Sequence, residues 1–97
     1  MIGARGPGHS SAMVDLERAT EECARCLHAV ASGQGSLTVA DGVVHTLELT
    51  VNLAPRSTET IKALTLVSAY RAFKMRAATN PVAARHELEL AVLTAGD

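Results

Sequence analysis

Aromatic side chains are almost absent from this sequence, which has one Tyr, one Phe and no Trp among 97 residues. Proteins that bind single-stranded nucleic acid stack bases on aromatic side chains, so Tyr70 and Phe73 alone argue against such a surface. An excess of one charge is also missing, because the formal net charge is −1 and the pI is about 6.4. This balance excludes a uniformly basic, histone-like protein.

Long apolar runs are missing as well, and none approaches the roughly 20 residues that span a bilayer. Residues 1–12 are rich in Gly, Ser and Pro and lack the apolar stretch of a secretory signal. We interpret 1–12 as a disordered leader and 13–97 as a single domain. The only two cysteines, Cys23 and Cys26, fit a reducing compartment. The sequence therefore predicts a cytoplasmic protein that does not bind membranes.

Cysteine and histidine motifs do not form a convincing metal or catalytic site. Cys23 and Cys26 form a CxxC in the middle of a predicted helix, whereas a redox CxxC lies at a helix N-terminus. A tetrahedral metal needs four ligands, and no second CxxC or paired His follows. The two cysteines are therefore interpreted as small core residues.

Two further patterns are incomplete. Residues 3–10 have the glycine spacing of a phosphate-binding P-loop, but His9 stands where Lys is required, and no strand precedes the loop. Residues 86–89, His-Glu-Leu-Glu, lack the second His of the HExxH zinc motif. We expect no metal, no cofactor and no catalytic residue, so the protein is not expected to be an enzyme.

Hydrophobic residues make up 47% of the chain, but 17 of them are Ala. A core built from so many Ala side chains has little volume, and small domains bury a low fraction of their surface. A lone protomer would therefore be marginally stable. This composition favours self-association.

Helical periodicity is clear in three segments. Residues 13–32 carry apolar and small residues at steps of three and four, and Gly33 is a natural stop in the left-handed conformation. Residues 58–79 form a second helix, capped by Ser57 or Thr58, that is apolar over most of its circumference. Such a helix is typically buried on two sides. Asn80 and Pro81 then open a third helix over 81–94.

Between the first two helices, the sequence predicts a β-hairpin that turns at Asp41–Gly42. A three-residue loop, 40–42, places the apolar residues of strands 36–39 and 43–53 on one face. The second strand is longer than the first, so its end has no local partner. Pairing with a second copy would cover this edge.

The predicted fold class is therefore α+β, in the order α-β-β-α-α, as a homodimer that shares a sheet. The dimer interface is expected along the second strand and the 58–79 helix. Its residues would be Leu49, Val51, Leu53, Leu66, Tyr70 and Phe73.

Charge is unevenly distributed along the chain. Between Glu59 and Glu87 there are five basic residues and no acid, whereas residues 15–22 carry four acids. One interpretation is a solvated face with salt bridges between helices. The other is a phosphate-binding surface at the C-terminal end of the 58–79 helix, without a groove-reading motif.

After the first helix, residues 33–78 contain a Gly-bearing link, a hairpin, a proline and an Ala-rich helix, in this order. The strand and turn Gly35-Ser-Leu-Thr-Val-Ala-Asp-Gly42 and the helix segment from Leu64 to Ala72 carry the likeness. Together they resemble the YbaB/EbfC family of bacterial nucleoid-associated proteins. The resemblance implies a homodimer that binds duplex DNA with little sequence preference.

We therefore expect a nucleoid-associated or regulatory DNA-binding protein. The expected phosphate contacts are Arg71, Lys74 and Arg76, with Arg18 and Arg25 on the first helix as further candidates. The alternative is a non-enzymatic protein–protein interaction module, such as an adaptor, a chaperone or a phage-type inhibitor. The expected partners are thus a second copy, duplex DNA or another protein.

Overall fold

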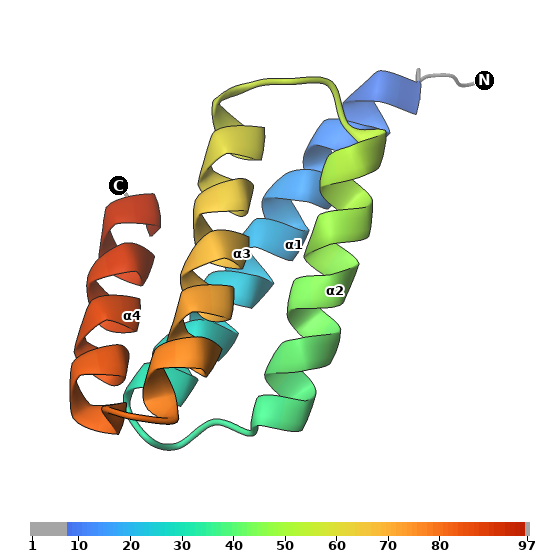
Figure 1. The fold of residues 1–97 in the computed structure, drawn as a ribbon. Coiled ribbons are helices and arrows are strands. Elements are labelled where there is room, and N and C mark those ends of the chain that lie inside the picture. The colour runs from blue at the N-terminus through green and yellow to red at the C-terminus, as the bar shows by residue number, and fades with distance from the viewer. Residues whose placement is uncertain (1–7, 97) are drawn as a thin grey trace.

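The secondary structure of residues 8–96, the part of the chain that the computed structural model describes, is α-helical (Figure 1). Its elements are α1 (Gly8–Ala31), α2 (Leu37–Leu53), α3 (Thr58–Ala77) and α4 (Pro81–Gly96). The predicted α+β class is therefore wrong, as is a dimer that shares a sheet, because residues 8–96 contain no strand. None of these helices combines the length and the apolar character needed to cross a membrane.

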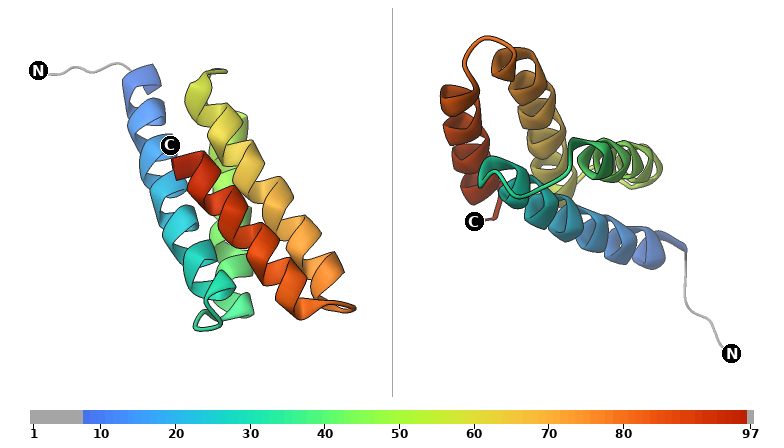
Figure 2. Two further views of the ribbon diagram at one scale, coloured as in Figure 1. Left: turned by 90° about the vertical axis from the view of Figure 1, so that its left-hand side faces the viewer. Right: turned by 90° about the horizontal axis from the view of Figure 1, so that it is seen from below.

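The helices α1 and α3 pack against each other, while α2 and α4 lie on opposite sides of this pair (Figures 1 and 2). Both α2 and α4 contact α1 and α3. Each helix contributes a fully buried Leu to the core: Leu16 and Leu27, Leu47, Leu66, and Leu88. This arrangement leaves the outward surfaces of α1 and α3 facing in opposite directions.

The predicted hairpin is instead the single helix α2. Ser36 caps its N-terminus, where the side chain accepts a hydrogen bond from the backbone N–H of Val39 at 3.4 Å. Ala40, expected in the hairpin loop, is fully buried, and Asp41–Gly42 lies inside the helix. Gly33 is the only glycine with positive φ among residues 8–96.

The apolar residues of 37–53 fit both the two-residue period of a strand and the 3.6-residue period of a helix. Alternation predicted that Leu49 and Leu53 lie inside, but they are 53% and 82% exposed. The buried side chains are Ala40, Val44 and Leu47, at helical steps of four and three. The β-branched residues of α2 cost only tenths of a kcal/mol each in a helix, so packing against α1 and α3 decides the conformation.

Gly42→Ala distinguishes the two conformations directly. In α2 a Cβ at this position meets no atom within 4 Å, so we expect the variant to be more stable by about 0.5–1 kcal/mol. A hairpin with Gly42 at positive φ would be destabilised by the same change. Urea denaturation followed by circular dichroism measures the sign, and a loss of stability would contradict the helix.

The other helix boundaries agree well with the sequence. Gly33 ends α1 with φ of 80°. Ser57 caps α3 in a reciprocal capping box with Thr60. Asn80 precedes α4 and accepts from the N–H of Ala83 at 3.2 Å. Of the predicted leader, residues 1–7 lie outside the described residues, and residues 8–12 belong to α1.

Candidate functional site

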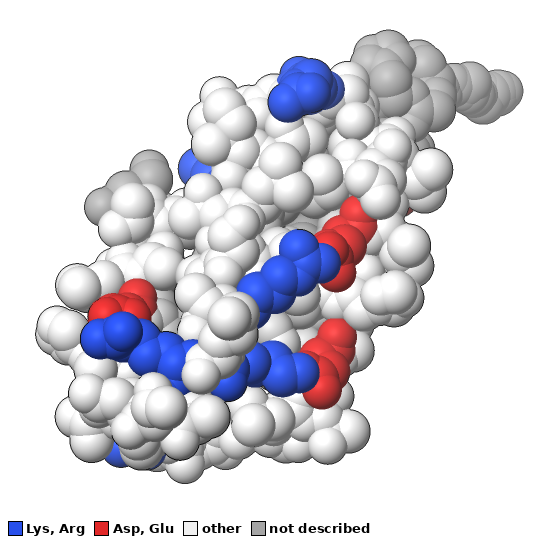
Figure 3. All heavy atoms as spheres, viewed as in Figure 1, with Lys and Arg blue, Asp and Glu red and all other residues white. Residues whose placement is uncertain are grey.

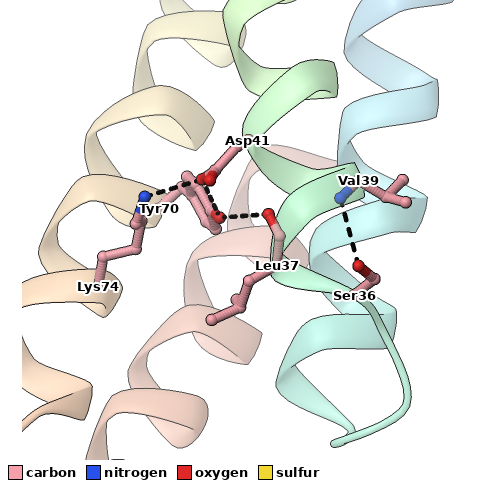
Figure 4. Close-up of polar contacts among 6 residues, drawn as sticks. All are labelled: Ser36, Leu37, Val39, Asp41, Tyr70 and Lys74. Carbon is pink, nitrogen blue, oxygen red and sulfur yellow. Dashed lines mark hydrogen bonds and ion pairs between the residues drawn. The ribbon is translucent and has the colours of Figure 1, made fainter.

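The densest group of polar side chains joins the start of α2 to the end of α3 (Figure 4). The Tyr70 hydroxyl donates to Asp41 Oδ1 at 2.6 Å and lies 3.2 Å from the Leu37 carbonyl oxygen. Lys74 Nζ donates to the same Asp41 oxygen at 2.8 Å and lies 5.5 Å from the centre of the Tyr70 ring. Together these contacts hold α2 against α3.

The pKa values in this group oppose a role in proton transfer. Hydrogen bonds from Lys74 and Tyr70 lower the pKa of the Asp41 carboxyl below its ordinary value. Burial, together with the hydrogen bond to Asp41, raises the pKa of the Tyr70 hydroxyl. Near neutral pH the carboxylate is charged and the phenol is protonated, so neither is poised to exchange a proton. The arrangement fits a structural lock between two helices.

Asp41→Asn is expected to destabilise the protein in a pH-dependent way. Because the pKa of Asp41 is lower in the folded state, its contribution to the free energy of unfolding is present when the pH is above its pKa in the unfolded chain, about 4. That contribution is lost as the pH falls through the folded pKa. Urea midpoints of the wild type and the variant should therefore differ at pH 7 and converge below about pH 4.

Asp15→Asn on the exposed surface of α1 is the matched control, and we expect its midpoint to follow the wild type at pH 7. If the urea midpoints of Asp41→Asn and the wild type differ by the same amount at pH 7 and below about pH 4, the Asp41 carboxylate does not stabilise the contact between α2 and α3.

The three residues expected to contact DNA phosphates all lie on α3, and each forms an ion pair within the chain. Arg71 pairs with Glu48, and Lys74 pairs with Asp41, both on α2. Arg76 Nε lies 3.2 Å from Glu87 Oε2 on α4. Lys62 also pairs, at 3.6 Å, with Glu59 on α3 itself. Four of the five bases between Glu59 and Glu87 thus have a carboxylate partner.

Arg18 and Arg25, the weaker candidates for phosphate contacts, lie on the outward surface of α1. They are far in the fold from the α3 bases, because α1 and α3 expose opposite sides (Figure 2). Arg18 and Arg25 share their surface with the exposed acids Glu21 and Glu22. The structure therefore does not bring the five expected phosphate contacts together into one basic patch.

Cys23 is buried in the core, and Cys26 is partly buried against it. Burial raises the pKa of the Cys23 thiol to about 12, with further contributions from Cys26 and Glu22. The pKa of Cys26 is also raised by burial. Within residues 8–96, no three His, Cys, Asp or Glu side chains are grouped to hold a metal ion. Residues 3–7 of the P-loop-like pattern lie outside the described residues, and Gly8 begins α1.

The interface expected for a shared sheet divides between the core and the surface. Leu66, Tyr70 and Phe73 are buried inside the protomer, so they cannot contact a partner without unfolding it. Val51 is partly buried, while Leu49 and Leu53 are exposed on α2. The predicted set thus does not form one continuous surface.

The sequence predicts a second buried side for the 58–79 helix but does not identify which residues form the outward side of α3, which we call the α3 outer face. It is free of charged side chains, and Ile61 and Met75 on it are 67% and 80% exposed. The Thr65 hydroxyl donates to the Ile61 carbonyl at 2.9 Å, so its hydrogen-bonding need is met within the helix. The face consists of Ile61, Leu64, Thr65, Ser68, Ala72 and Met75, all exposed.

Figure 3 shows this surface: basic side chains extend across it and touch acids at its sides, and an uncharged area lies above them. A shallow groove of about 550 Å³ runs along the α4 side of α3, between Ile61, Leu64 and Ala91. A second groove, on the α2 side, shares Leu64 and reaches Val51 and Thr60. The α3 outer face is therefore a ridge with a groove on each side.

Comparison of the chain with protein-family models, with curated proteins and with solved structures finds no match. The residues that resemble the YbaB/EbfC strand and turn, 35–42, fall in the α1–α2 connection and the first turns of α2. The resemblance stays a prediction from the sequence.

Proposed function

We propose that the chain is a non-enzymatic protein–protein interaction module that binds an uncharged helix of its partner on the α3 outer face. The observation that carries this proposal is the contrast between the two outward surfaces of the bundle. The surface of α1 carries Arg18, Glu21, Glu22 and Arg25, as expected for a solvated helix. The α3 outer face is instead an uncharged strip, bounded by the exposed bases Arg71 and Arg76, which pair with acids on α2 and α4.

Burial of this face would supply the free energy of binding. Full burial of an Ile, Leu or Met side chain is worth about 1.5–3 kcal/mol, and Ile61 and Met75 are still mostly exposed. The charged groups at the edges, Arg71 and Arg76, already have carboxylate partners in the chain. A partner would therefore cover apolar surface without leaving a bare cation at the rim.

Binding to duplex DNA with little sequence preference remains the competing prediction. Arg71, Lys74 and Arg76 would each have to exchange a carboxylate for a phosphate, so the net electrostatic gain is small compared with that of free bases. This cost favours the protein-binding function over the DNA-binding one.

Site-specific photo-crosslinking tests the proposal in the full chain. Benzoylphenylalanine at Met75 reports on the α3 outer face, and the same group at Arg18, also exposed, is the matched control on α1. In an extract of the source cells, we expect a protein adduct from position 75 only. Because the face is uncharged, the yield of the adduct should not fall when irradiation is carried out at high salt. Absence of an adduct at 75, or equal adducts at both positions, would overturn the proposal.

A gel shift with random-sequence duplex at about 50 mM salt tests the competing function. We expect no shift. A shift that rising salt removes, and that is absent when Arg71, Lys74 and Arg76 are all changed to Glu, would establish DNA binding in place of the proposed function.

A further inference from the structure

We infer that the partner helix is α3 of a second copy, packed antiparallel across a two-fold axis that passes by Ser68. The inference rests on the proposed function and names its partner. It commits to a homodimer built from helices, in which each protomer presents the same α3 outer face.

Four residues of the face are spaced symmetrically about Ser68, whereas the counterpart of Thr65 is Arg71, at the edge of the face. In an antiparallel pair with its axis at this residue, positions equally far before and after it face each other. Ile61 and Met75 are each seven residues from Ser68, and Leu64 and Ala72 are each four away. Ile61 would thus meet the partner's Met75, and Leu64 would meet the partner's Ala72. The face is self-complementary, as a two-fold interface requires.

The sizes of these side chains also fit a crossing of two helices. Ser68 and Ala72 are small, so two backbones can approach closely at the centre. Helices that cross at an angle diverge toward their ends, and there the longer side chains of Ile61 and Met75 fill the gap. Leu64 of each copy would pack on Ala72 of the other, whose small side chain leaves room for it.

α3 is long enough for an antiparallel copy to lie along it, because a helix of 20 residues is about 30 Å long. Ile61, Leu64 and Met75 are 67%, 46% and 80% exposed along this length, so the second copy would remove the large apolar side chains of the face from water. An interface confined to one helix face and its shallow grooves is small, so we expect a weak dimer with a dissociation constant of about micromolar order.

The ion pairs of α3 make a two-fold contact electrostatically acceptable. A symmetric interface brings like charges of the two copies near each other, which opposes association. Here Arg71 is paired with Glu48 and Arg76 with Glu87 on either side of the face. Each protomer thus presents neutral pairs at the rim.

The outward surface of α2 is the main rival for self-association, because Val39, Leu49 and Leu53 are also exposed on it. The position of α3 favours the α3 outer face: α2 and α4 flank it, so a helix that crosses α3 also covers the two grooves. The α2 surface supplies the matched control, since Leu49 is as apolar as Leu64 and is 53% exposed, against 46%.

Sedimentation equilibrium of the full chain over about 10–500 µM tests the inference. We expect the wild type to approach twice its 10.1 kDa mass. Ser68→Arg should raise the dissociation constant by about 100-fold or more, with an unchanged helical circular dichroism spectrum. Leu49→Arg should change it by less than about threefold. A monomeric wild type at the highest concentration, or a dimer broken by Leu49→Arg and kept by Ser68→Arg, would overturn the inference.

A second variant keeps the inference testable if Ser68→Arg fails to fold. Ser68→Cys combined with Cys26→Ser should form a disulfide-linked dimer on mild oxidation, because the two Ser68 residues would face each other at the axis. Thr46→Cys in the same background, at an exposed site on α2, should stay monomeric. Equal linkage at both sites would contradict the α3 interface.

Failure of the dimer and failure of the proposed function give different results. If position 75 crosslinks to a different protein while the wild type sediments as a monomer, the homodimer is overturned and the binding function is retained. If position 75 gives no adduct with any protein and the wild type is monomeric, both are overturned.

Discussion

Leu66→Ala is expected to lower the free energy of unfolding by about 2–5 kcal/mol. Leu66 is fully buried on α3, the helix that contacts each of the other three. Truncation removes its favourable transfer from water and leaves a cavity that the surrounding helices fill only in part. Because a small domain has only about 5–15 kcal/mol of stability in total, the variant should lose a large share of it.

Leu64→Ala on the same helix is the matched control. Leu64 is 46% exposed in the protomer, so its truncation should cost less than about 1 kcal/mol under conditions where the chain is monomeric. Urea denaturation at low micromolar protein concentration measures both values. Equal losses for the two variants would mean that α3 does not present Leu66 to the core as described.

The fold was predictable where local signals and packing agree. Ser57, Asn80 and Gly33 mark helix ends, and the sequence placed each of them correctly. The 37–53 segment failed because its apolar residues satisfy both an alternating and a helical pattern, and its Val and Thr residues favour strands in isolation. Contacts with α1 and α3, which are not visible in the local sequence, select the helix.

The same misassignment hid the candidate site. Asp41 and Glu48 are seven residues apart, which places them on the same side of a helix and on opposite faces of a strand. Only as a helix does α2 direct both carboxylates at Lys74 and Arg71. The sequence identified the bases of α3, and the structure confirms one of its two interpretations, salt bridges between helices. It did not identify Asp41 and Glu48 as the carboxylate partners.

The sequence predicts that the helix over 58–79 is buried on two sides. One side of α3 is buried in the protomer, through residues such as Ala63, Val67 and Tyr70. The opposite side is the α3 outer face, which lies open in the single chain. The sequence pattern and the structure thus describe the same helix, and the proposed dimer would supply the second burial.

Gly35→Ala is expected to cost about 1–3 kcal/mol, because the connection between α1 and α2 folds back tightly on the end of α1. The N–H groups of Gln34 and Gly35 both donate to the Ala29 carbonyl, at 2.8 and 3.0 Å. A Cβ on Gly35 would lie 2.8 Å from the backbone nitrogen of Val30 and 2.9 Å from its Cγ2. Since one of these atoms is backbone, the loop must shift and its hydrogen bonds to Ala29 must weaken.

Gly42 is the matched control for this effect. Gly42→Ala, with open space around its Cβ, should move stability in the opposite direction. In thermal unfolding, a 1 kcal/mol change shifts the midpoint of a domain of this size by about 4–8 °C. Gly35→Ala should therefore melt well below the wild type and Gly42→Ala slightly above it. If Gly35→Ala melts with the wild type, the connection does not pack on Val30, and the loop that directs α2 onto α1 must follow a different path.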